Sequence, residues 1–129
     1  MKKMIKNKRI LIVEDEKAVA TILNRKLSKE GFDIILATDG KEGLKKALSE
    51  KPDLILLDIV LPIMDGLTML KKLRQNSKGK NIPVIILTNL TTDPERLTNA
   101  GKYGTADYLV KANWSINDLT QKVMDTFSK

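Results

Sequence analysis

The sequence contains neither cysteine nor histidine, and only 4% of its residues are aromatic. Without cysteine the chain can form no disulfide and offers no thiolate. Without histidine it has no histidine metal ligand, no histidine-based catalytic triad and no phosphohistidine of its own. Any chemical site must therefore be built from carboxylates, hydroxyls and lysines.

The sequence also lacks a long hydrophobic run. Its most apolar stretches, Leu54–Leu57 and Val84–Leu87, are as short as strands, whereas a membrane span needs about 20 residues. Near the N-terminus, the apolar run Ile10–Val13 is interrupted by Glu14–Glu16, so it does not form the core of a signal peptide. We therefore expect a cytoplasmic chain without a membrane span.

The length of 129 residues and the hydrophobic content of 42% are typical of one folded domain. We expect residues 8–128 to form the folded core and residues 1–7 to form a basic N-terminal arm. The formal net charge is +7, and ten basic residues in two clusters supply this excess: Lys2, Lys3, Lys6, Lys8 and Arg9, and Lys71, Lys72, Arg74, Lys78 and Lys80. Such clusters are usually solvated surface, although they invite a nucleic-acid hypothesis.

Short apolar segments alternate with segments of helical periodicity. The expected strands are Ile10–Val13, Asp33–Ala37, Leu54–Leu57, Val84–Leu87 and Asp107–Val110. The first two helices are indicated by apolar residues at steps of three and four, namely Val19, Ile22, Leu23 and Leu27, and then Leu44, Ala47 and Leu48. Gly31 and Lys51-Pro52 are expected to end these two helices.

Three more helices complete the expected pattern. One spans Gly66–Gln75, the next opens at Asp93-Pro94, and Ser115 is expected to cap the last. Strict alternation of strands and helices predicts an α/β fold. We expect a flavodoxin-like, doubly wound parallel sheet of five strands in the order 2-1-3-4-5, with five helices.

In such a sheet the ligand site lies beyond the carboxyl ends of the strands, where the winding reverses between the first and third strands. Glu14 and Asp15 follow the first strand, and Asp58 follows the third. Neighbouring strands lie about 5 Å apart, so Asp15 and Asp58 can share one ion. Clustered carboxylates raise one another's pKa unless a cation lies among them, and oxygen ligands alone favour Mg²⁺.

A site of this kind suits phosphoryl transfer, with an aspartate as nucleophile. Thr88 and Lys111 end the fourth and fifth strands and could hold phosphoryl oxygens. Each residue also has a simpler explanation. The acids Glu14–Glu16 could favour the positive end of the first helix, Tyr108 could pack in the core, and Thr88 and Lys111 could be ordinary polar residues at strand ends.

Four segments together resemble the receiver domain of bacterial response regulators, in the order and spacing of that family. They are Ile10–Glu16 (ILIVEDE), Leu56–Gly66 (LLDIVLPIMDG), Pro83–Thr88 (PVIILT) and Gly104–Lys111 (GTADYLVK). The resemblance covers essentially the whole chain. It implies that Asp58 is the phosphoacceptor, that Asp15 binds Mg²⁺ directly, that Glu14 assists through water, and that the backbone carbonyl of Val60 reaches the metal.

The resemblance also implies a switch formed by Thr88 and Tyr108, with Lys111 pairing with the phosphoryl group. Two positions depart from the family pattern. Ala112 replaces the proline that usually follows the lysine in a cis peptide, which makes a cis bond costly here. Asn89 replaces a small residue after the switch threonine, and it could change the lifetime of the phosphoryl group.

The partners implied by the resemblance are a histidine kinase or a histidine phosphotransfer protein as phosphodonor. A downstream protein would bind through the fourth helix, the fifth strand and the fifth helix, and phosphorylation could induce a dimer. The resemblance describes a signalling module that accepts phosphate and removes it from itself, rather than a dedicated multiple-turnover enzyme.

Three alternatives remain open at the level of the sequence. A small phosphohydrolase with an aspartate nucleophile commonly has a second aspartate two residues later, where this chain has Val60. A nucleic-acid-associated adaptor is suggested only by charge, since there is no helix-turn-helix pattern, zinc site or pair of stacking aromatics. A receiver fold that binds partners without phosphorylation is the third.

Overall fold

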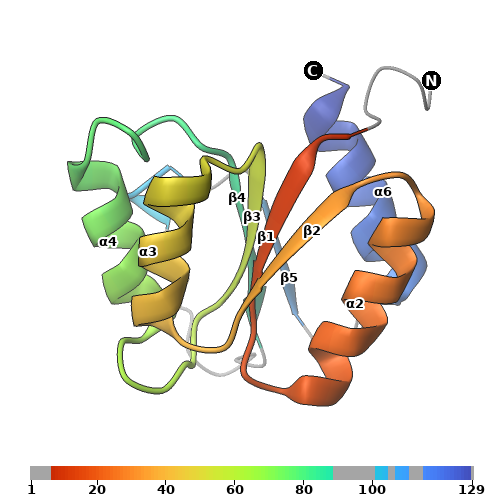
Figure 1. Ribbon diagram of the computed structural model, residues 1–129, viewed down its shortest axis with the longest axis horizontal. Helices are drawn as coiled ribbons and strands as arrows, with labels where there is room; N and C mark the ends of the chain where they lie inside the picture. The colour runs from red at the N-terminus through yellow and green to blue at the C-terminus, as the bar shows by residue number, and fades with distance from the viewer. Residues whose placement is uncertain (1–6, 89–100, 105–106, 111–114, 129) are drawn as a thin grey trace.

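The expected strands all belong to one parallel sheet in the computed structural model, which describes residues 7–88, 101–104, 107–110 and 115–128 (Figure 1). The strands are β1 (Arg9–Val13), β2 (Asp33–Ala37), β3 (Leu54–Asp58), β4 (Val84–Thr88) and β5 (Asp107–Val110). Their order is β2-β1-β3-β4-β5, with every neighbouring pair parallel.

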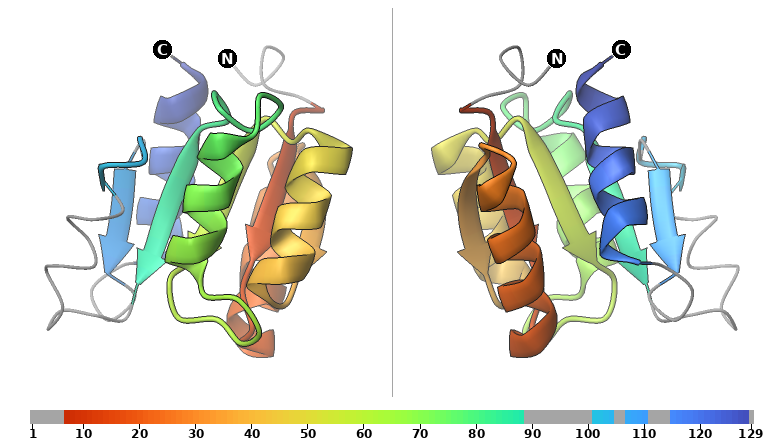
Figure 2. Two further views of the ribbon diagram at one scale, coloured as in Figure 1. Left: turned by 90° about the vertical axis from the view of Figure 1, so that its left-hand side faces the viewer. Right: turned by 90° about the vertical axis from the view of Figure 1, so that its right-hand side faces the viewer.

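Four helices cover the sheet within the described residues: α2 (Lys17–Lys29), α3 (Gly40–Glu50), α4 (Gly66–Gln75) and α6 (Ile116–Phe127). Helices α3 and α4 lie on one face, and α2 and α6 lie on the other (Figures 1 and 2). The predicted flavodoxin-like parallel sheet is therefore confirmed. The helix expected to open at Asp93-Pro94 lies outside the described residues. In the described part of the chain, every helix is too short or too polar to cross a bilayer.

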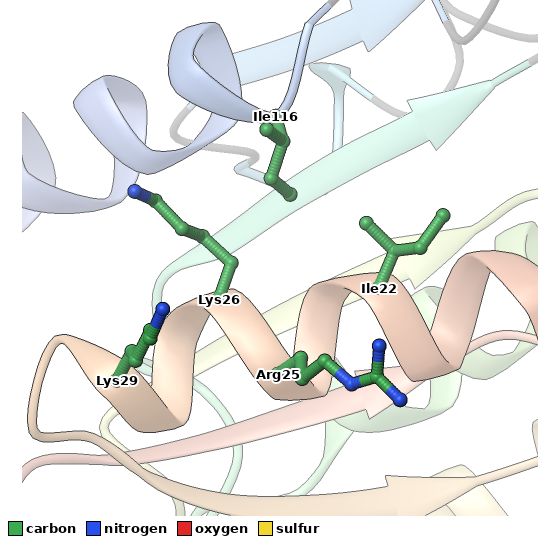
Figure 3. Close-up of a pocket in the computed structure, with 5 residues that line it drawn as sticks. All are labelled: Ile22, Arg25, Lys26, Lys29 and Ile116. Atoms are coloured by element: carbon green, nitrogen blue, oxygen red, sulfur yellow. The ribbon is translucent and has the colours of Figure 1, made fainter.

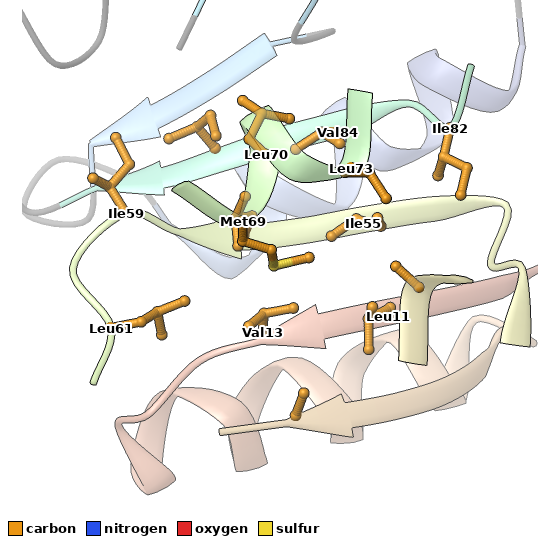
Figure 4. Packing of buried hydrophobic residues seen from close by; sticks show 14 residues of the cluster. Leu11, Val13, Ile55, Ile59, Leu61, Met69, Leu70, Leu73, Ile82 and Val84 are labelled. Carbon is orange, nitrogen blue, oxygen red and sulfur yellow. The ribbon is translucent and has the colours of Figure 1, made fainter. Parts of the chain in front are cut away.

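The strands read as continuous apolar runs because both faces of the sheet are buried. Alternate residues of β1 point to opposite faces, so Leu11 and Val13 join one core cluster while Ile10 and Ile12 join the other. The first cluster includes Met69 of α4. Figure 4 shows how the residues of this cluster pack. The second packs against α2 and α6. Burying such side chains stabilises the fold by roughly 1.5–3 kcal/mol each.

Several helices begin or end at residues that form the hydrogen bonds and turns typical of helix caps. Ser115 accepts a hydrogen bond from the backbone N–H of Asp118, whose carboxylate accepts one from the backbone N–H of Ser115, so the predicted cap is a complete capping box. Gly31 follows α2 with φ 99°, a conformation that glycine adopts without strain. Asp65, which opens α4, accepts a hydrogen bond from the N–H of Thr68 over 2.9 Å.

Ile22 departs from the buried stripe that the periodicity of the first helix predicts. Leu23 and Leu27 are fully buried on α2, but the side chain of Ile22 is 54% exposed. Adjacent helical residues lie about 100° apart around the axis, so a stripe centred on Leu23 and Leu27 leaves Ile22 at its edge. That expectation was wrong: α2 carries an uncovered isoleucine on its outer surface.

The sequence predicts that Arg74 belongs to a solvated basic cluster, but its side chain is partly buried and bound to the backbone. At the end of α4 its guanidinium donates to three backbone carbonyls: Nε to Tyr103 over 2.6 Å, Nη1 to Gly79 over 2.8 Å and Nη2 to Gly104 over 2.8 Å. Partial burial lowers the pKa of Arg74 by desolvation. The side chain therefore ties α4 to the segment that precedes β5, a contact between parts of the chain distant in sequence.

Replacing Arg74 with methionine should lower the free energy of unfolding by about 2 kcal/mol, because three charge-assisted hydrogen bonds are lost. Arg74→Lys should recover less than half of this loss, because an ammonium group lacks the planar fork of donors. Urea denaturation measures both. Lys71→Met, at an exposed position of the same helix, is the control and should change stability by less than about 0.5 kcal/mol. Equal stability of Arg74→Met and the native chain would contradict the stabilising role of the three Arg74 hydrogen bonds.

Candidate functional site

The register of the central strands places two carboxylates side by side at one edge of the sheet. Val13 of β1 pairs with Leu57 of β3, and the next residue on each strand is Glu14 or Asp58. The backbone N–H of Glu14 donates to the carbonyl of Ala37 over 3.0 Å, so the β1–β2 ladder continues to this residue. The carboxyl ends of the strands, where the arrowheads lie in Figure 2, form the site.

Three acidic side chains converge there. Carboxylate oxygens of Glu14, Glu16 and Asp58 all lie within 4.8 Å of one another. Glu14 is 1% exposed and Asp58 is 4% exposed, whereas Glu16 is exposed. Two buried carboxylates and a third at the surface therefore share one small volume.

The local backbone holds both buried carboxylates in place. The N–H of Glu16 donates to Oε2 of Glu14 over 3.1 Å, and the N–H of Val60 donates to Oδ1 of Asp58 over 3.3 Å. Each carboxylate thus accepts a hydrogen bond from the residue two positions later, at the start of its own loop. This arrangement fixes the oxygens before any ligand arrives.

The electrostatics of the cluster favour a bound cation. Carboxylates at this separation repel one another, and burial strengthens the repulsion because the local dielectric is lower than that of water. A divalent ion removes the repulsion. The donor set consists of hard carboxylate oxygens, and this is the chemistry that Mg²⁺ requires. The residues present therefore fit Mg²⁺.

The structure brings together a different set of acids from the one expected. Asp15 is exposed and is not part of the cluster, whereas Glu16 is. In an extended segment, residues two apart point to the same side, and Glu16 is still extended, with φ −77° and ψ 107°. The spacing between Glu14 and Glu16 was the signal that could have identified Glu16.

Of these acids, only Glu16 lies at the start of the helix that follows, as the N-cap residue of α2, where a negative charge favours the positive end of the helix. Helix α2 has no acidic residue in its first turn, and the side chain of its N-cap residue, Glu16, makes no capping hydrogen bond. The carboxylate of Glu16 instead faces Glu14 and Asp58.

The loop after Asp58 is folded tightly against the end of β3. The N–H of Gly66 donates to the carbonyl of Ile59 over 2.7 Å, and a Cβ atom on Gly66 would lie 2.1 Å from the carbonyl oxygen of Asp58. Only glycine fits at this position. Ile59 and Leu61 of the loop are buried, as Figure 4 shows, whereas Val60 is 51% exposed beside the site.

The other predicted site residues are only partly described. Thr88 ends β4 and pairs in register with Val110, and Tyr108 pairs with Ile86. The residue before Thr88, Leu87, pairs with Asp58, so the backbone of Thr88 lies next to that of the predicted acceptor. Lys111, with Asn89 and Ala112, lies outside the described residues.

A comparison with protein families gives one match that spans most of the chain. The family model described as the response regulator receiver domain matches residues 10–124. The chain is 42% identical over 105 residues to the alkaline phosphatase synthesis transcriptional regulatory protein PhoP of Bacillus subtilis, which covers 81% of this chain and 42% of PhoP. It is 39% identical over 115 residues to the response regulator ArlR of Staphylococcus saprophyticus, which covers 89% of this chain and 50% of ArlR. The chain thus spans about half the length of these curated relatives.

Solved structures of receiver domains are similar to this structure over nearly the whole chain. The receiver domain of the Francisella response regulator 1452 matches with a TM-score of 0.84 and 34% identity, covering 95% of this chain and 98% of that one. The receiver domain of the sensor histidine kinase PA1611 from Pseudomonas aeruginosa matches with a TM-score of 0.84 and 29% identity, covering 95% and 99%. That structure holds a magnesium ion coordinated in its active site cleft.

Replacing Gly66 with alanine should shift the backbone of Asp58 and Ile59 and lower the free energy of unfolding by about 1–3 kcal/mol, because the added methyl group overlaps backbone atoms. Urea denaturation measures the loss, and amide chemical shifts locate the displacement. Gly101→Ala is the matched control, since a Cβ there meets no atom within 4 Å. A Gly66→Ala protein as stable as the Gly101→Ala protein would contradict the close approach.

Proposed function

Because the chain belongs to the response regulator receiver domain family, we propose that Asp58 accepts a phosphoryl group from the phosphohistidine of a histidine kinase or histidine phosphotransfer protein. The observation that supports this most directly is the convergence of the Asp58 carboxylate with Glu14 and Glu16 at the end of β3. Receiver domains are signalling modules, and the proposal assigns this chain the same role.

The proposed reaction uses Asp58 as the nucleophile. A carboxylate oxygen attacks phosphorus and forms an acyl phosphate, while the phosphorus–nitrogen bond of the donor breaks. The imidazole nitrogen leaves with the bonding electron pair and takes up a proton. The hydrogen bond from the N–H of Val60 to Oδ1 of Asp58 holds the carboxylate in a fixed orientation, which reduces the entropic cost of the attack.

Mg²⁺ is the cofactor that the proposal requires. Bound at this site, it would neutralise charge on the carboxylates and on the phosphoryl oxygens. We propose Asp58, Asp15 and the backbone carbonyl of Val60 as direct ligands, with Glu14 assisting through water. Asp15 directly follows Glu14 and is exposed, so its side chain is free to rotate toward the ion.

The proposed switch connects the phosphorylated site to a surface. Thr88 and Lys111 would hold the phosphoryl oxygens, and Tyr108 would change its position with Thr88. Support comes from the register, which places Thr88 one residue beyond the partner of Asp58 on β4. A local change of charge would then bias a two-state element, and the affected surface would include β5 and α6.

The proposal extends to the partners and location expected from the sequence. A downstream protein would recognise the face formed by β5, α6 and the helix expected after Asp93-Pro94, and phosphorylation could induce a dimer there. The matched region makes up 42% of PhoP and 50% of ArlR, and the proposal covers this region alone. We also propose that the chain is located in the cytoplasm.

Incubation with Mg²⁺ and a small acyl phosphate should add one phosphoryl group, detected by mass spectrometry of the intact protein. Asp58→Asn should abolish the addition, because an amide oxygen is a poor nucleophile. Asp33→Asn, which changes an exposed acid at the start of β2, is the control and should be phosphorylated normally. The absence of any mass increase, or an increase that persists in Asp58→Asn, would refute the proposal. Multiple turnover of phosphomonoesters would identify a phosphohydrolase instead.

Two further variants test whether Asp15 or Glu16 binds Mg²⁺ directly. Asp15→Asn should weaken Mg²⁺ binding by about tenfold or more, as expected for loss of a charged ligand, whereas Glu16→Gln should weaken it less than about threefold. Isothermal titration with MgCl₂ measures both affinities. The opposite ranking would show that Glu16, which the structure places in the cluster, is the direct ligand in place of Asp15.

A further inference from the structure

Exposed lysines gather around the C-terminal end of α4, at the end of the sheet opposite the acids. From Gly66 to Thr92 the sequence contains five basic residues and no aspartate or glutamate. Four of the five are exposed lysines, and Lys102 in the described segment 101–104 is exposed as well. We call the following five residues the lysine cluster: Lys71, Lys72, Lys78, Lys80 and Lys102.

Arg74 holds the parts of the lysine cluster together. Lys78 and Lys80 flank Gly79, whose carbonyl accepts a hydrogen bond from Nη1 of Arg74 over 2.8 Å. Lys102 precedes Tyr103, whose carbonyl accepts a hydrogen bond from Nε over 2.6 Å. One guanidinium thus brings the loop after α4 and the segment before β5 together, and both segments carry lysines.

The charge of the lysine cluster is not compensated by acidic side chains nearby. Among the residues that the structure describes, no lysine of the cluster takes part in an ion pair. The negative end of the α4 dipole accounts for Lys72 and Arg74, which lie in its last turn. It does not account for Lys78, Lys80 and Lys102, which lie beyond the helix. The cluster therefore keeps an excess of positive charge at the surface.

The polar residues among these lysines are of the kind that contacts phosphate. Gln75, Ser77 and Asn81 are exposed at the end of α4 and in the loop that follows it. In complexes with nucleic acids, amide and hydroxyl side chains supplement lysine and arginine in hydrogen bonds to the phosphate backbone. The composition of this surface therefore suits a phosphodiester backbone.

The lysine cluster contains no exposed large hydrophobic side chain. Within the described residues such side chains lie on α2, on β2 and in the loop after β3. The cations of α2 have a different setting, because Arg25 and Lys29 line a pocket of ≈ 360 Å³ together with Ile22 and Ile116 (Figure 3). Protein partners are usually anchored by buried apolar or aromatic side chains, and binding at a membrane surface usually inserts apolar side chains. A uniformly anionic partner needs neither.

We propose that the lysine cluster binds the phosphate backbone of a double-stranded nucleic acid without reading its sequence. Duplex DNA carries one negative charge per about 1.7 Å of its axis, so lysines on α4 and on two adjoining segments can contact several phosphates at once. A helix-turn-helix or stacking aromatics serve to read bases, and contacts to the backbone do not require them.

The lysine cluster and the acidic site lie at opposite ends of the sheet. The loop after α4 and the segment 101–104 lead into the amino ends of β4 and β5, whereas Asp58 lies at the carboxyl end of β3, where the arrowheads lie in Figure 2. A bound duplex therefore leaves the acids accessible. The proposal does not depend on the chemistry of Asp58.

Fluorescence anisotropy with a short fluorescein-labelled DNA duplex tests the proposal on the native chain. The logarithm of the affinity should fall linearly with the logarithm of the KCl concentration, with a slope of about −4 for four or five phosphate contacts. A duplex of unrelated sequence should bind within about twofold. The triple variant Lys72→Gln/Lys78→Gln/Lys80→Gln should weaken binding by about tenfold or more and should make the slope less steep by about 3.

The matched control is Lys17→Gln/Arg25→Gln/Lys29→Gln, which removes three charges from exposed positions of α2, across the sheet from α4 (Figure 1). It should leave binding within about threefold, since exposed charges far from the contact are screened by salt. Both variants change only exposed side chains, so their urea midpoints should match that of the native chain. Phosphorylation by a small acyl phosphate should persist in the cluster variant, so failure of this proposal and failure of the Asp58 proposal give different results.

Four outcomes would overturn the proposal. The first is the absence of saturable binding at low salt. The second is equal weakening by the cluster variant and the α2 control, which would show that net charge alone controls binding. The third is binding that the cluster variant leaves unchanged, which would place the contact elsewhere on the chain. The fourth is tighter binding to vesicles containing phosphatidylglycerol than to the duplex, through the same lysines, which would identify a lipid surface as the partner.

Discussion

Repulsion between carboxylates at the ends of two adjacent strands is the constraint on which the site depends. The parallel register of β1 and β3 places Glu14 and Asp58 side by side, and both are almost completely buried. Glu16 adds a third negative charge nearby. A folded chain can hold such acids together if the surrounding structure fixes them strongly and if a cation, or the uptake of a proton, relieves their repulsion.

The rest of the fold supplies that rigidity. Apolar runs in the central strands allow both faces of the sheet to be covered, which anchors the strand ends on which the acids lie. The close approach of Gly66 to the carbonyl of Asp58 fixes the loop beside the proposed acceptor. Arg74 acts at a distance from the acids and ties α4 to the segment that leads into β5, the strand that Lys111 follows.

The sequence predicted the parts of the structure that depend on local pattern. The apolar strands, the Ser115 cap and the glycine after α2 each follow from short-range rules, and the positions of Glu14 and Asp58 follow from strand order. Three features were missed, and two of them, the contacts of Arg74 and the exposure of Ile22, depend on tertiary geometry. Glu16 joins the acids because the chain is still extended there, Arg74 finds carbonyls far along the chain, and Ile22 falls outside the area that the sheet can cover.

The most direct test of the central claim compares unfolding in urea of the native chain and of Asp58→Asn, each in EDTA and in saturating MgCl₂. If the acidic cluster requires a cation, Asp58→Asn will be the more stable protein in EDTA, because it carries one charge less in the cluster. Mg²⁺ will then stabilise the native chain more than the variant, since only the native site binds the ion fully. A native chain that is indifferent to Mg²⁺ and more stable than Asp58→Asn in EDTA would contradict the account.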